Sequence, residues 1–227
     1  QVTVIVTDQK KVPQKDINVI VKNDLGDKVT GKTDKNGEVT VPEVEKTEHH
    51  SAYVVGYTDG TFGPERNMTR SEAAAIFARL LADKNGDNIS SVAKTKFSDV
   101  PAYAWYSGYV KYLNNNGVTY GHSKTIFAPD EQITRAEFTT MAVRFFDVYG
   151  DGDAEIMEQF KSFDDVSDGY WAAEYIKAAA KHGWITGYGD GSFRADRQIT
   201  RAEVVTLVDR LLGRVADLEY VSDNLRK

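Results

Sequence analysis

Cysteine is absent from this chain of 227 residues, which excludes disulfides, thiolate metal ligands and cysteine nucleophiles. Long apolar runs are also missing. No stretch approaches the 18 or more apolar residues of a membrane span, and the residues after Gln1 lack the basic and apolar regions of a signal peptide. The formal net charge is −6, so we expect no broad positive field that attracts nucleic acid. An anionic ligand would have to be bound by a few positively charged side chains at its site.

Motifs of catalysis are lacking as well. The sequence contains no phosphate-binding glycine loop with lysine, no nucleophile elbow and no zinc motif. Carboxylates are numerous, yet no spacing marks two of them as a general acid and base. Hydrophobic residues nevertheless make up 41% of the chain, which suffices for an ordinary folded core. We therefore expect a folded protein that is not an enzyme, without catalytic residues, metal or cofactor.

The first 48 residues have the alternation of short β-strands. Apolar and polar residues alternate in three stretches, Val2–Val6, Ile17–Val21 and Val39–Val41. Turn-forming residues gather at Asn23–Asp27 and Asp34–Gly37, and the Asn36-Gly37 pair favours a tight hairpin. We expect four short strands in a small β-sandwich-like module or a fragment of one. This segment resembles the immunoglobulin-like or carboxypeptidase-regulatory-like modules of bacterial surface proteins, and we expect it to act as a spacer.

A repeat with a period of about 65 residues occupies the rest of the chain. The tetrad Thr-Arg-Ser/Ala-Glu begins at Thr69, Thr134 and Thr200. Thirteen residues before each threonine stands a glycine, and seven before it a phenylalanine: Gly56, Gly121, Gly187, Phe62, Phe127 and Phe193. Phe97-Ser98-Asp99-Val100 recurs as Phe163-Asp164-Asp165-Val166, with Trp105 and Trp171 equally far downstream. So many matches in one register establish the repeat.

Each repeat is predicted to contain a capped amphipathic helix. The tetrad is typical of a capping box, in which the Thr hydroxyl and the Glu carboxylate accept each other's backbone N–H. Apolar residues follow it at helical spacing, as at Ile76, Phe77 and Leu80. Two repeats have a preceding helix with Trp105 or Trp171 on its apolar face, and Gly117 and Gly183 stand where these helices end. Such helix-loop-helix units must pack on one another to bury their apolar faces.

Arg70, Arg135 and Arg201 hold the first position of the three capped helices. A cation there opposes the helix dipole at a cost of a few tenths of a kcal/mol. The spacing leaves two interpretations open. The arginine and the free N–H groups form an anion site that grips a carboxylate, or the arginine pairs with an acid such as Asp99 or Asp165 and locks the repeats together.

Six aromatic residues are candidates for stacking on sugar rings, although residues of this kind also serve as core. They are Trp105, Trp171, Tyr57, Tyr188, Tyr109 and Tyr175.

The ordered motifs Phe-x-Asp-Val, Trp, Gly-Tyr-x-Asp-Gly-Ser/Thr-Phe and Thr-Arg-Ala/Ser-Glu resemble those of the S-layer homology family, over residues 51–214. The resemblance implies a mainly α-helical domain at 49–214, followed by a linker at 215–227. Its helix-loop-helix repeats (49–82, 97–149 and 163–214) would form a pseudo-threefold helical bundle with the first helices of the repeats at its centre. It also implies a secreted, extracellular module in the cell wall or S-layer of Gram-positive bacteria.

The resemblance further implies grooves between repeats that bind secondary cell-wall polysaccharide carrying pyruvylated N-acetylmannosamine. Arg70, Arg135 and Arg201 would meet the pyruvate carboxylate. Other groove positions match the family's motifs: Asp99, Asp165, Trp105, Trp171, Gly56, Gly121, Gly187, Tyr57 and Tyr188.

Two departures from the family pattern carry expectations of their own. The second repeat has His122 where its neighbours have Tyr, and Lys124-Thr125 where they have Asp-Gly, so its groove is expected to bind differently. The first repeat lacks Phe-x-Asp-Val and the Trp-bearing helix, and the next such motif would fall just beyond Lys227. We expect a half-repeat after Lys227 to complete the set, so that Arg201 lacks its partner half-site. The exposed face would then form a homodimer or be covered by residues 1–48.

The leading hypothesis is a non-catalytic wall anchor that binds polysaccharide, with no nucleic-acid partner and no membrane span. The alternative is a structural self-assembly or oligomerisation module of a surface-layer protein. An enzyme is a third hypothesis, in which any catalytic domain lies outside this chain.

Overall fold

The computed structural model describes residues 2–8, 10–22, 28–41, 52–150 and 162–214. The chain divides into two compact units, Gln1–His50 and Ser51–Lys227. The predicted turn at Asn23–Asp27 and the predicted linker at 215–227 lie outside the described residues.

In the first unit, the residues that the structure describes include four short strands in two antiparallel pairs. They are β1 (Val2–Ile5), β2 (Asn18–Lys22), β3 (Lys28–Lys32) and β4 (Glu38–Val41). Strand β1 pairs with β4, with Val4 opposite Val39, and β2 pairs with β3, with Ile20 opposite Thr30. Val39 is buried, whereas Ile20 is 56% exposed.

The turn predicted at Asp34–Gly37 is present, but the strands on its two sides pair elsewhere. The Asp34 carboxylate accepts the N–H groups of Asn36 and Glu38, at 2.7 and 3.0 Å. Gly37 has a φ of 71°, and a Cβ there would lie 2.5 Å from the carbonyl oxygen of Val6. The turn therefore requires glycine, and it carries the chain from the β2–β3 pair to the β1–β4 pair rather than closing a hairpin ladder.

The described residues of the second unit form five helices. They are α1 (Arg70–Asn85), α2 (Ser107–Asn115), α3 (Arg135–Tyr149), α4 (Ala173–Lys181) and α5 (Arg201–Leu211). The predicted capping boxes are confirmed at Thr69, Thr134 and Thr200, where both reciprocal hydrogen bonds are present. The predicted glycines follow the ends of α2 and α4 with left-handed backbone, at φ 76° for Gly117 and 70° for Gly183.

The tryptophans, however, precede α2 and α4 instead of lying within them. Trp105 is 55% exposed and Trp171 is 57% exposed, so neither belongs to the apolar face of its helix.

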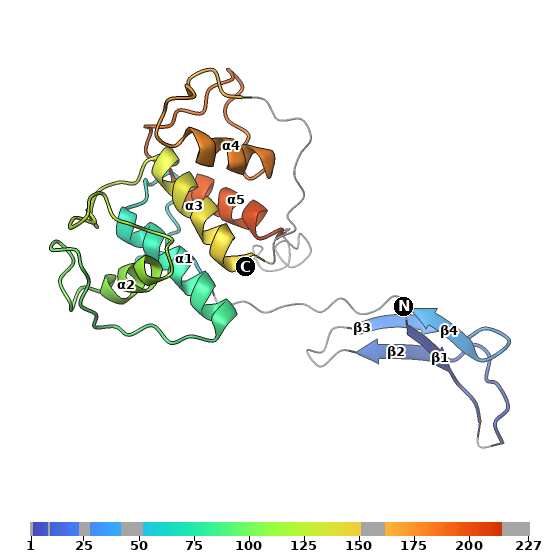
Figure 1. The fold of residues 1–227 in the computed structure, drawn as a ribbon. Helices are drawn as coiled ribbons and strands as arrows, with labels where there is room; N and C mark the ends of the chain where they lie inside the picture. Colours follow the sequence, from blue (N-terminus) through green and yellow to red (C-terminus); the bar gives the residue numbers. More distant parts are fainter. Residues whose placement is uncertain (1, 9, 23–27, 42–51, 151–161, 215–227) are drawn as a thin grey trace. The chain divides into compact units, whose positions relative to one another are not determined.

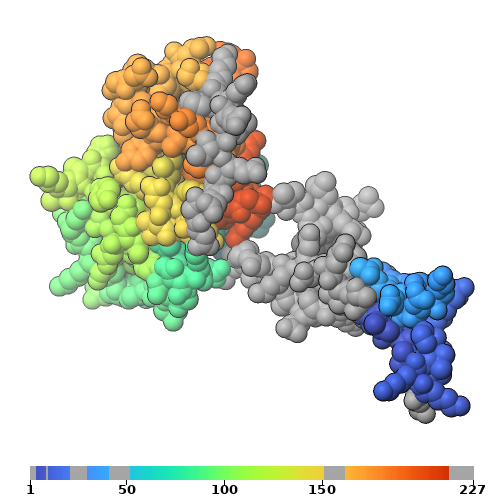
Figure 2. Space-filling view, turned by 45° about the vertical axis from the view of Figure 1, so that its right-hand side comes forward, coloured from blue at the N-terminus to red at the C-terminus, as the bar shows by residue number. Residues whose placement is uncertain are grey.

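The capped helices α1, α3 and α5 lie inside the unit, and α2 and α4 lie outside them (Figure 1). Helix α3 packs against both α1 and α5, whereas α2 packs on α1 and α4 packs on α3. Figure 2 shows the same order on the surface, where the yellow band that contains α3 lies between green and orange residues. The expectation that the first helices of the repeats form the centre is therefore wrong. Ala73, Ala74 and Ala75 give α1 an apolar surface on several sides, as a central helix needs.

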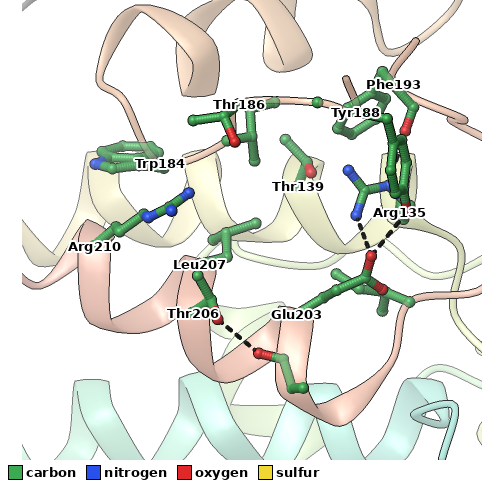
Figure 3. Close-up of a pocket in the computed structure, with 14 residues that line it drawn as sticks. Arg135, Thr139, Trp184, Thr186, Tyr188, Phe193, Glu203, Thr206, Leu207 and Arg210 are labelled. Carbon is green, nitrogen blue, oxygen red and sulfur yellow. Dashed lines mark hydrogen bonds and ion pairs between the residues drawn. The ribbon is translucent and has the colours of Figure 1, made fainter. Parts of the chain in front are cut away.

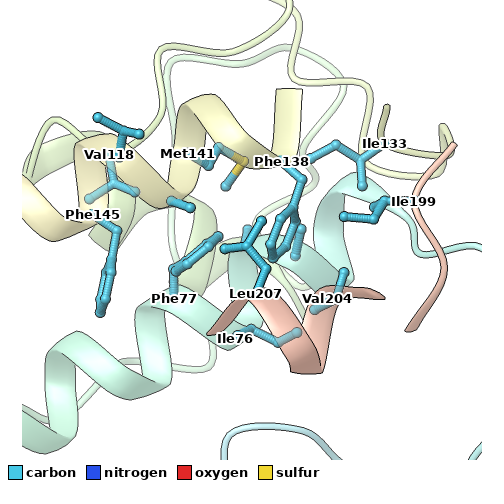
Figure 4. Packing of buried hydrophobic residues seen from close by; sticks show 14 of the residues in the cluster. Ile76, Phe77, Val118, Ile133, Phe138, Met141, Phe145, Ile199, Val204 and Leu207 are labelled. Carbon is cyan, nitrogen blue, oxygen red and sulfur yellow. The ribbon is translucent and has the colours of Figure 1, made fainter. Parts of the chain in front are cut away.

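Phenylalanines fill the space between the central helices (Figure 4). The Phe77 ring centroid lies 5.1 Å from that of Phe138 and 5.0 Å from that of Phe145. All three side chains are fully buried. Because burying one such side chain contributes about 1.5–3 kcal/mol, this cluster joins α1 and α3 into one core.

Three backbone hydrogen bonds connect the repeats cyclically. The N–H of Met68 donates to the carbonyl of Ile199, that of Ile199 to Ile133, and that of Ile133 back to Met68, at 2.9–3.1 Å. Each of these residues immediately precedes a capping threonine. The start of each capped helix is therefore fixed against the other two, including the helix of the first repeat.

Candidate functional site

The three arginines at the helix starts are buried. Arg70, Arg135 and Arg201 are 5%, 8% and 3% exposed. The Nε of each donates to the carbonyl of the recurring phenylalanine in another repeat: Arg70 to Phe127 (2.7 Å), Arg135 to Phe193 (2.8 Å) and Arg201 to Phe62 (2.9 Å). The same bond made three times means that each arginine is fixed by a neighbouring repeat.

The acids that face these arginines are the capping glutamates. Arg70 Nη1 lies 2.8 Å from Glu137 Oε1, and Arg135 Nη1 lies 2.9 Å from Glu203 Oε1. The third distance, from Arg201 Nη1 to Glu72 Oε1, is 4.0 Å. The interpretation of the arginines as locks between repeats is confirmed. The prediction that Asp99 or Asp165 pairs with these arginines is wrong, because each arginine faces the capping-box glutamate of another repeat.

Asp99 and Asp165 instead stabilise strained backbone. Asp99 accepts the N–H groups of Phe127 and Ala128, at 2.9 and 2.7 Å, and Asp165 accepts those of Phe193 and Arg194, both at 2.7 Å. Ala128 and Arg194 have φ angles of 59° and 58°, which non-glycine residues rarely adopt. Neither aspartate lines any of the three grooves that the repeats form between them.

Where the structure describes the repeats, three grooves lie between them, each built on one arginine. Groove A, about 200 Å³, is lined by Arg201, Gly56, Tyr57, Glu72, Arg79 and Trp105. Groove B, about 450 Å³, is lined by Arg70, Gly121, His122, Glu137, Arg144 and Trp171. Groove C, about 260 Å³, is lined by Arg135, Gly187, Tyr188, Glu203, Arg210 and Trp184. Ten of the twelve site residues predicted from the sequence thus line a groove.

The grooves share a plan that takes residues from different repeats. Each combines the helix-start arginine of one repeat with the glycine loop and the capping glutamate of another. Grooves A and B also include the tryptophan that precedes the following outer helix. The expectation that Arg201 lacks its partner half-site is therefore wrong, since groove A joins it to Trp105. In groove C, within the described residues, the buried Trp184 is the only tryptophan of the lining.

A second arginine in each groove was missed by the sequence reasoning. Arg79, Arg144 and Arg210 each stand ten residues after a capping threonine. Their recurrence at one position of the repeat is therefore the sequence signal that identifies them. Arg144 donates from Nη2 to the Tyr175 hydroxyl at 3.1 Å, and its guanidinium lies 4.9 Å from the Tyr120 ring centroid. Every groove thus contains a buried cation and a more accessible one.

Guanidinium groups cover the tyrosines that were candidates for sugar stacking. Arg201 lies 4.8 Å from the Tyr57 ring centroid, and Arg135 lies 4.9 Å from that of Tyr188. Tyr109 and Tyr175 have similar neighbours in Arg79 and Arg144. The half-exposed Trp105 and Trp171 offer the more open faces.

Groove C has the densest network of charged groups (Figure 3). Glu203 accepts hydrogen bonds from Arg135, from Arg197 and, at 2.9 Å, from the Tyr188 hydroxyl. Burial acts to raise the pKa of Glu203, but the Thr200 N–H, Tyr188 and the arginines outweigh it and lower the pKa. Burial lowers the pKa of Arg135, although Glu203 opposes this effect. The groove therefore keeps a desolvated cation beside an ionised carboxylate.

Groove B differs from its neighbours as the sequence indicates. His122 replaces tyrosine, and its Nδ1 lies 4.0 Å from Glu137 Oε1.

The described ranges hold no cluster of three or more His, Asp or Glu side chains suited to a metal ion. Of the helices within them, none has the length and apolar composition to cross a membrane.

The S-layer homology domain matches this sequence at residues 43–74, 96–139 and 162–205. These segments together make up more than half of the chain. The chain therefore belongs to the S-layer homology family.

Curated relatives are similar in sequence to most of this chain. Cell surface glycoprotein 1 of Acetivibrio thermocellus is 38% identical over 73% of this chain and 7% of its own length. The cellulosome-anchoring protein of the same species is 36% identical over 81% of this chain and 40% of its own length. The surface-layer 125 kDa protein of Lysinibacillus sphaericus is 30% identical over 71% of this chain and 13% of its own length.

The chain thus spans less than half the length of each of these relatives, and other relatives carry the names of enzymes. Membership of the family makes the chain an extracellular, cell-wall-associated protein.

Proposed function

We propose that this chain is a non-catalytic module that anchors a surface protein to the cell wall by binding wall polysaccharide in grooves A, B and C. The observation that carries the proposal is the recurrence of a buried arginine and a second arginine in each groove. Two guanidinium groups in a partly desolvated groove favour an anionic ligand, and arginine matches the planar geometry of a carboxylate. The relative named as a cellulosome-anchoring protein supports the same role.

The ligand proposed is a pyruvylated N-acetylmannosamine unit of a secondary cell-wall polysaccharide. Arg70 and Arg135 each use Nε and Nη1 inside the protein. Their Nη2 groups make no hydrogen bond to another described residue, so they are free to donate to a pyruvate carboxylate. The sugar ring would stack on Trp171 in groove B or Trp105 in groove A, each of which is more than half exposed.

The cyclic contacts support a pseudo-threefold arrangement of the repeats. The Arg–Phe bonds and the Arg–Glu pairs run from the first repeat to the second, from the second to the third and from the third to the first. The three backbone bonds close the same cycle in the opposite direction. Under this proposal the three grooves are copies of one site placed around an axis, and a polymer with repeated acidic units engages several of them.

Sedimentation with cell-wall sacculi tests the proposal. Wild-type protein is expected to sediment with intact sacculi and to remain in solution after the polysaccharide is extracted. A soluble pyruvylated N-acetylmannosamine glycoside should release it, and the same glycoside without pyruvate should not. Equal sedimentation with extracted sacculi would contradict the proposed ligand.

Variants of the more accessible arginines test the site. The double variant Arg144→Ala and Arg210→Ala should sediment less, whereas Arg144→Lys with Arg210→Lys keeps the charge and should retain part of the binding. Circular dichroism checks that each variant is folded. Undiminished binding by the double alanine variant would argue against grooves B and C.

Self-assembly is a second candidate, favoured by the exposed aromatic side chain of Tyr103, which is 85% exposed beside the half-exposed Trp105. An assembly or homodimer through this surface would grow with protein concentration and be indifferent to added polysaccharide. Analytical ultracentrifugation of the wild type and Tyr103→Ser distinguishes it from anchoring.

A further inference from the structure

Two neighbouring threonines on α3 have buried hydroxyl groups without hydrogen-bond partners. Thr139 is 1% exposed and Thr140 is 3% exposed, and neither Oγ1 bonds to any other described residue. Buried hydroxyls in proteins are normally paired, and an unpaired one costs roughly 1–3 kcal/mol. A threonine within a helix usually returns its hydroxyl to the carbonyl four residues earlier, as Thr206 does to Ala202 at 2.9 Å.

The two side chains face different grooves. Adjacent residues on a helix point about 100° apart, so Thr139 and Thr140 lie on either side of α3. Thr139 lines groove C, where it stands between Thr186 and Arg135 (Figure 3). Thr140 lines groove B together with Glu137 and Arg144. Each unpaired hydroxyl therefore stands in the same groove as an arginine proposed to bind the carboxylate.

Groove A has no such hydroxyl at the matching positions. Relative to the capping threonine, the residues that match Thr139 are Ala74 and Val205, and those that match Thr140 are Ala75 and Thr206. Ala75 lines groove A, where Thr140 lines groove B. The hydroxyls are thus a property of grooves B and C rather than of the repeat.

We propose that Thr139 and Thr140 are specificity-determining residues that hydrogen-bond a hydroxyl or acetamido oxygen of the sugar bound in grooves C and B. This rests on the proposed function, since it takes the ligand to be a sugar. Threonine adds no charge, so it discriminates between sugars that carry the same carboxylate. Groove A, with Ala75 in this place, binds the same sugar more weakly.

Thr139→Val and Thr140→Val remove the hydroxyl and nearly preserve the shape. Because each hydroxyl is unpaired in the free protein, the urea midpoint of either variant should be unchanged or higher. Calorimetric titration with a pyruvylated N-acetylmannosamine glycoside should show the affected groove weakened about three- to tenfold, the effect of one neutral hydrogen bond. Thr139→Ser and Thr140→Ser keep the hydroxyl and should bind like the wild type.

Two further variants complete the experiment. Ser107→Ala removes a buried hydroxyl that donates to the Ala102 carbonyl away from the three grooves and should leave sugar affinity unchanged, whereas Ala75→Ser should strengthen groove A. Wild-type affinity in both Val variants, with the wild type itself binding, would overturn the inference and leave the proposed function standing. A wild type that binds no glycoside would instead count against the proposed function.

Discussion

Under the proposed function, Arg70 and Arg135 combine two tasks in one side chain. Nε and Nη1 hold two repeats together, and Nη2 is left for a ligand in Arg70 and Arg135. Arg201 differs, because its Nη2 donates to the Val55 carbonyl at 2.8 Å. Loss of binding in a variant of these residues would therefore not by itself establish contact with the ligand.

Arg70→Ala is predicted to destabilise the protein as well as weaken binding. It leaves Glu137 and the Phe127 carbonyl without their partner in a poorly solvated place, so the free energy of unfolding should fall by about 2–4 kcal/mol. Urea denaturation followed by circular dichroism measures this loss. The half-buried Arg144→Ala is the control, with an expected loss of about 1 kcal/mol. Equal losses in the two variants would contradict the locking role of Arg70.

Gly121 is predicted to tolerate no side chain. Its φ is 88°, and a Cβ there would lie 2.3 Å from the Phe97 ring and 2.7 Å from the Ile126 carbonyl oxygen. Gly121→Ala should cost about 2–4 kcal/mol because left-handed strain and overpacking add. Gly189→Ala meets no atom within 4 Å and should leave the thermal midpoint nearly unchanged. A midpoint for Gly121→Ala equal to that of Gly189→Ala would refute the steric argument.

Single residues were predictable from the sequence to different degrees. The recurrence of Arg70, Arg135 and Arg201 marked them correctly, but their glutamate partners lie in another repeat, and spacing within one repeat does not indicate which repeats meet. Arg79, Arg144 and Arg210 were recognisable by the same recurrence. Thr139 and Thr140 were not, because their burial beside grooves B and C depends on how the helices pack.

The capping box of α5 does more than begin a helix, because Glu203 also receives Arg135 from α3. The same carboxylate therefore stabilises the N-terminal end of the α5 dipole, joins two repeats and lines groove C. Its lowered pKa makes this arrangement depend on pH.

Stability is predicted to fall in acid partly through Glu203. The folded pKa of Glu203 is below its ordinary value of 4.5, so its stabilising contribution is complete above that value and is lost as pH falls through the lowered pKa. Unfolding free energies from pH 7 to pH 3 should show Glu203→Gln less stable than wild type at pH 7, with the difference shrinking in acid. The exposed Glu174→Gln should follow the wild-type curve. A constant difference between wild type and Glu203→Gln would rule out this linkage.

The helices themselves were largely predictable and their arrangement was not. Capping boxes and apolar spacing gave the starts of α1, α3 and α5 correctly, since both signals are local. The family resemblance implied that the outer helices lie at the centre. An apolar stripe shows that a helix face is buried but not which neighbour buries it, so the sequence pattern could not correct that placement. Trp105 and Trp171 fitted the stripe of α2 and α4, yet those helices begin only after them.

The second unit depends on contacts between its two ends. The Tyr53 hydroxyl donates to Asp209 Oδ1 at 2.6 Å, and Arg214 lies over the Tyr53 ring. Together with the bond from Met68 to Ile199, this contact joins the first repeat to the third across most of the sequence.

Tyr53→Phe is predicted to weaken the whole set of repeats and not the first alone. Removing the hydroxyl leaves Asp209 without this donor and should lower the free energy of unfolding by about 1–2 kcal/mol. Because the repeats form one cyclic set, the fluorescence of Trp184 in the third repeat and the far-ultraviolet signal should shift together. Separate transitions for the two probes would indicate that the repeats unfold independently. Tyr103→Phe, at an exposed position, should shift neither probe.

The ring through Met68, Ile133 and Ile199 also sets the order in which the molecule is completed. During synthesis the N–H of Met68 emerges long before the carbonyl of Ile199 that accepts it. The start of the first capped helix can therefore be fixed only after the third repeat has been made. A contact between residues so distant in sequence forms only when the long segment between them closes into a loop. Until residue 199 has been made, groove A has neither Arg201 nor its closing wall. Under the proposed function, the module can therefore bind wall polysaccharide in groove A only after its third repeat has left the ribosome.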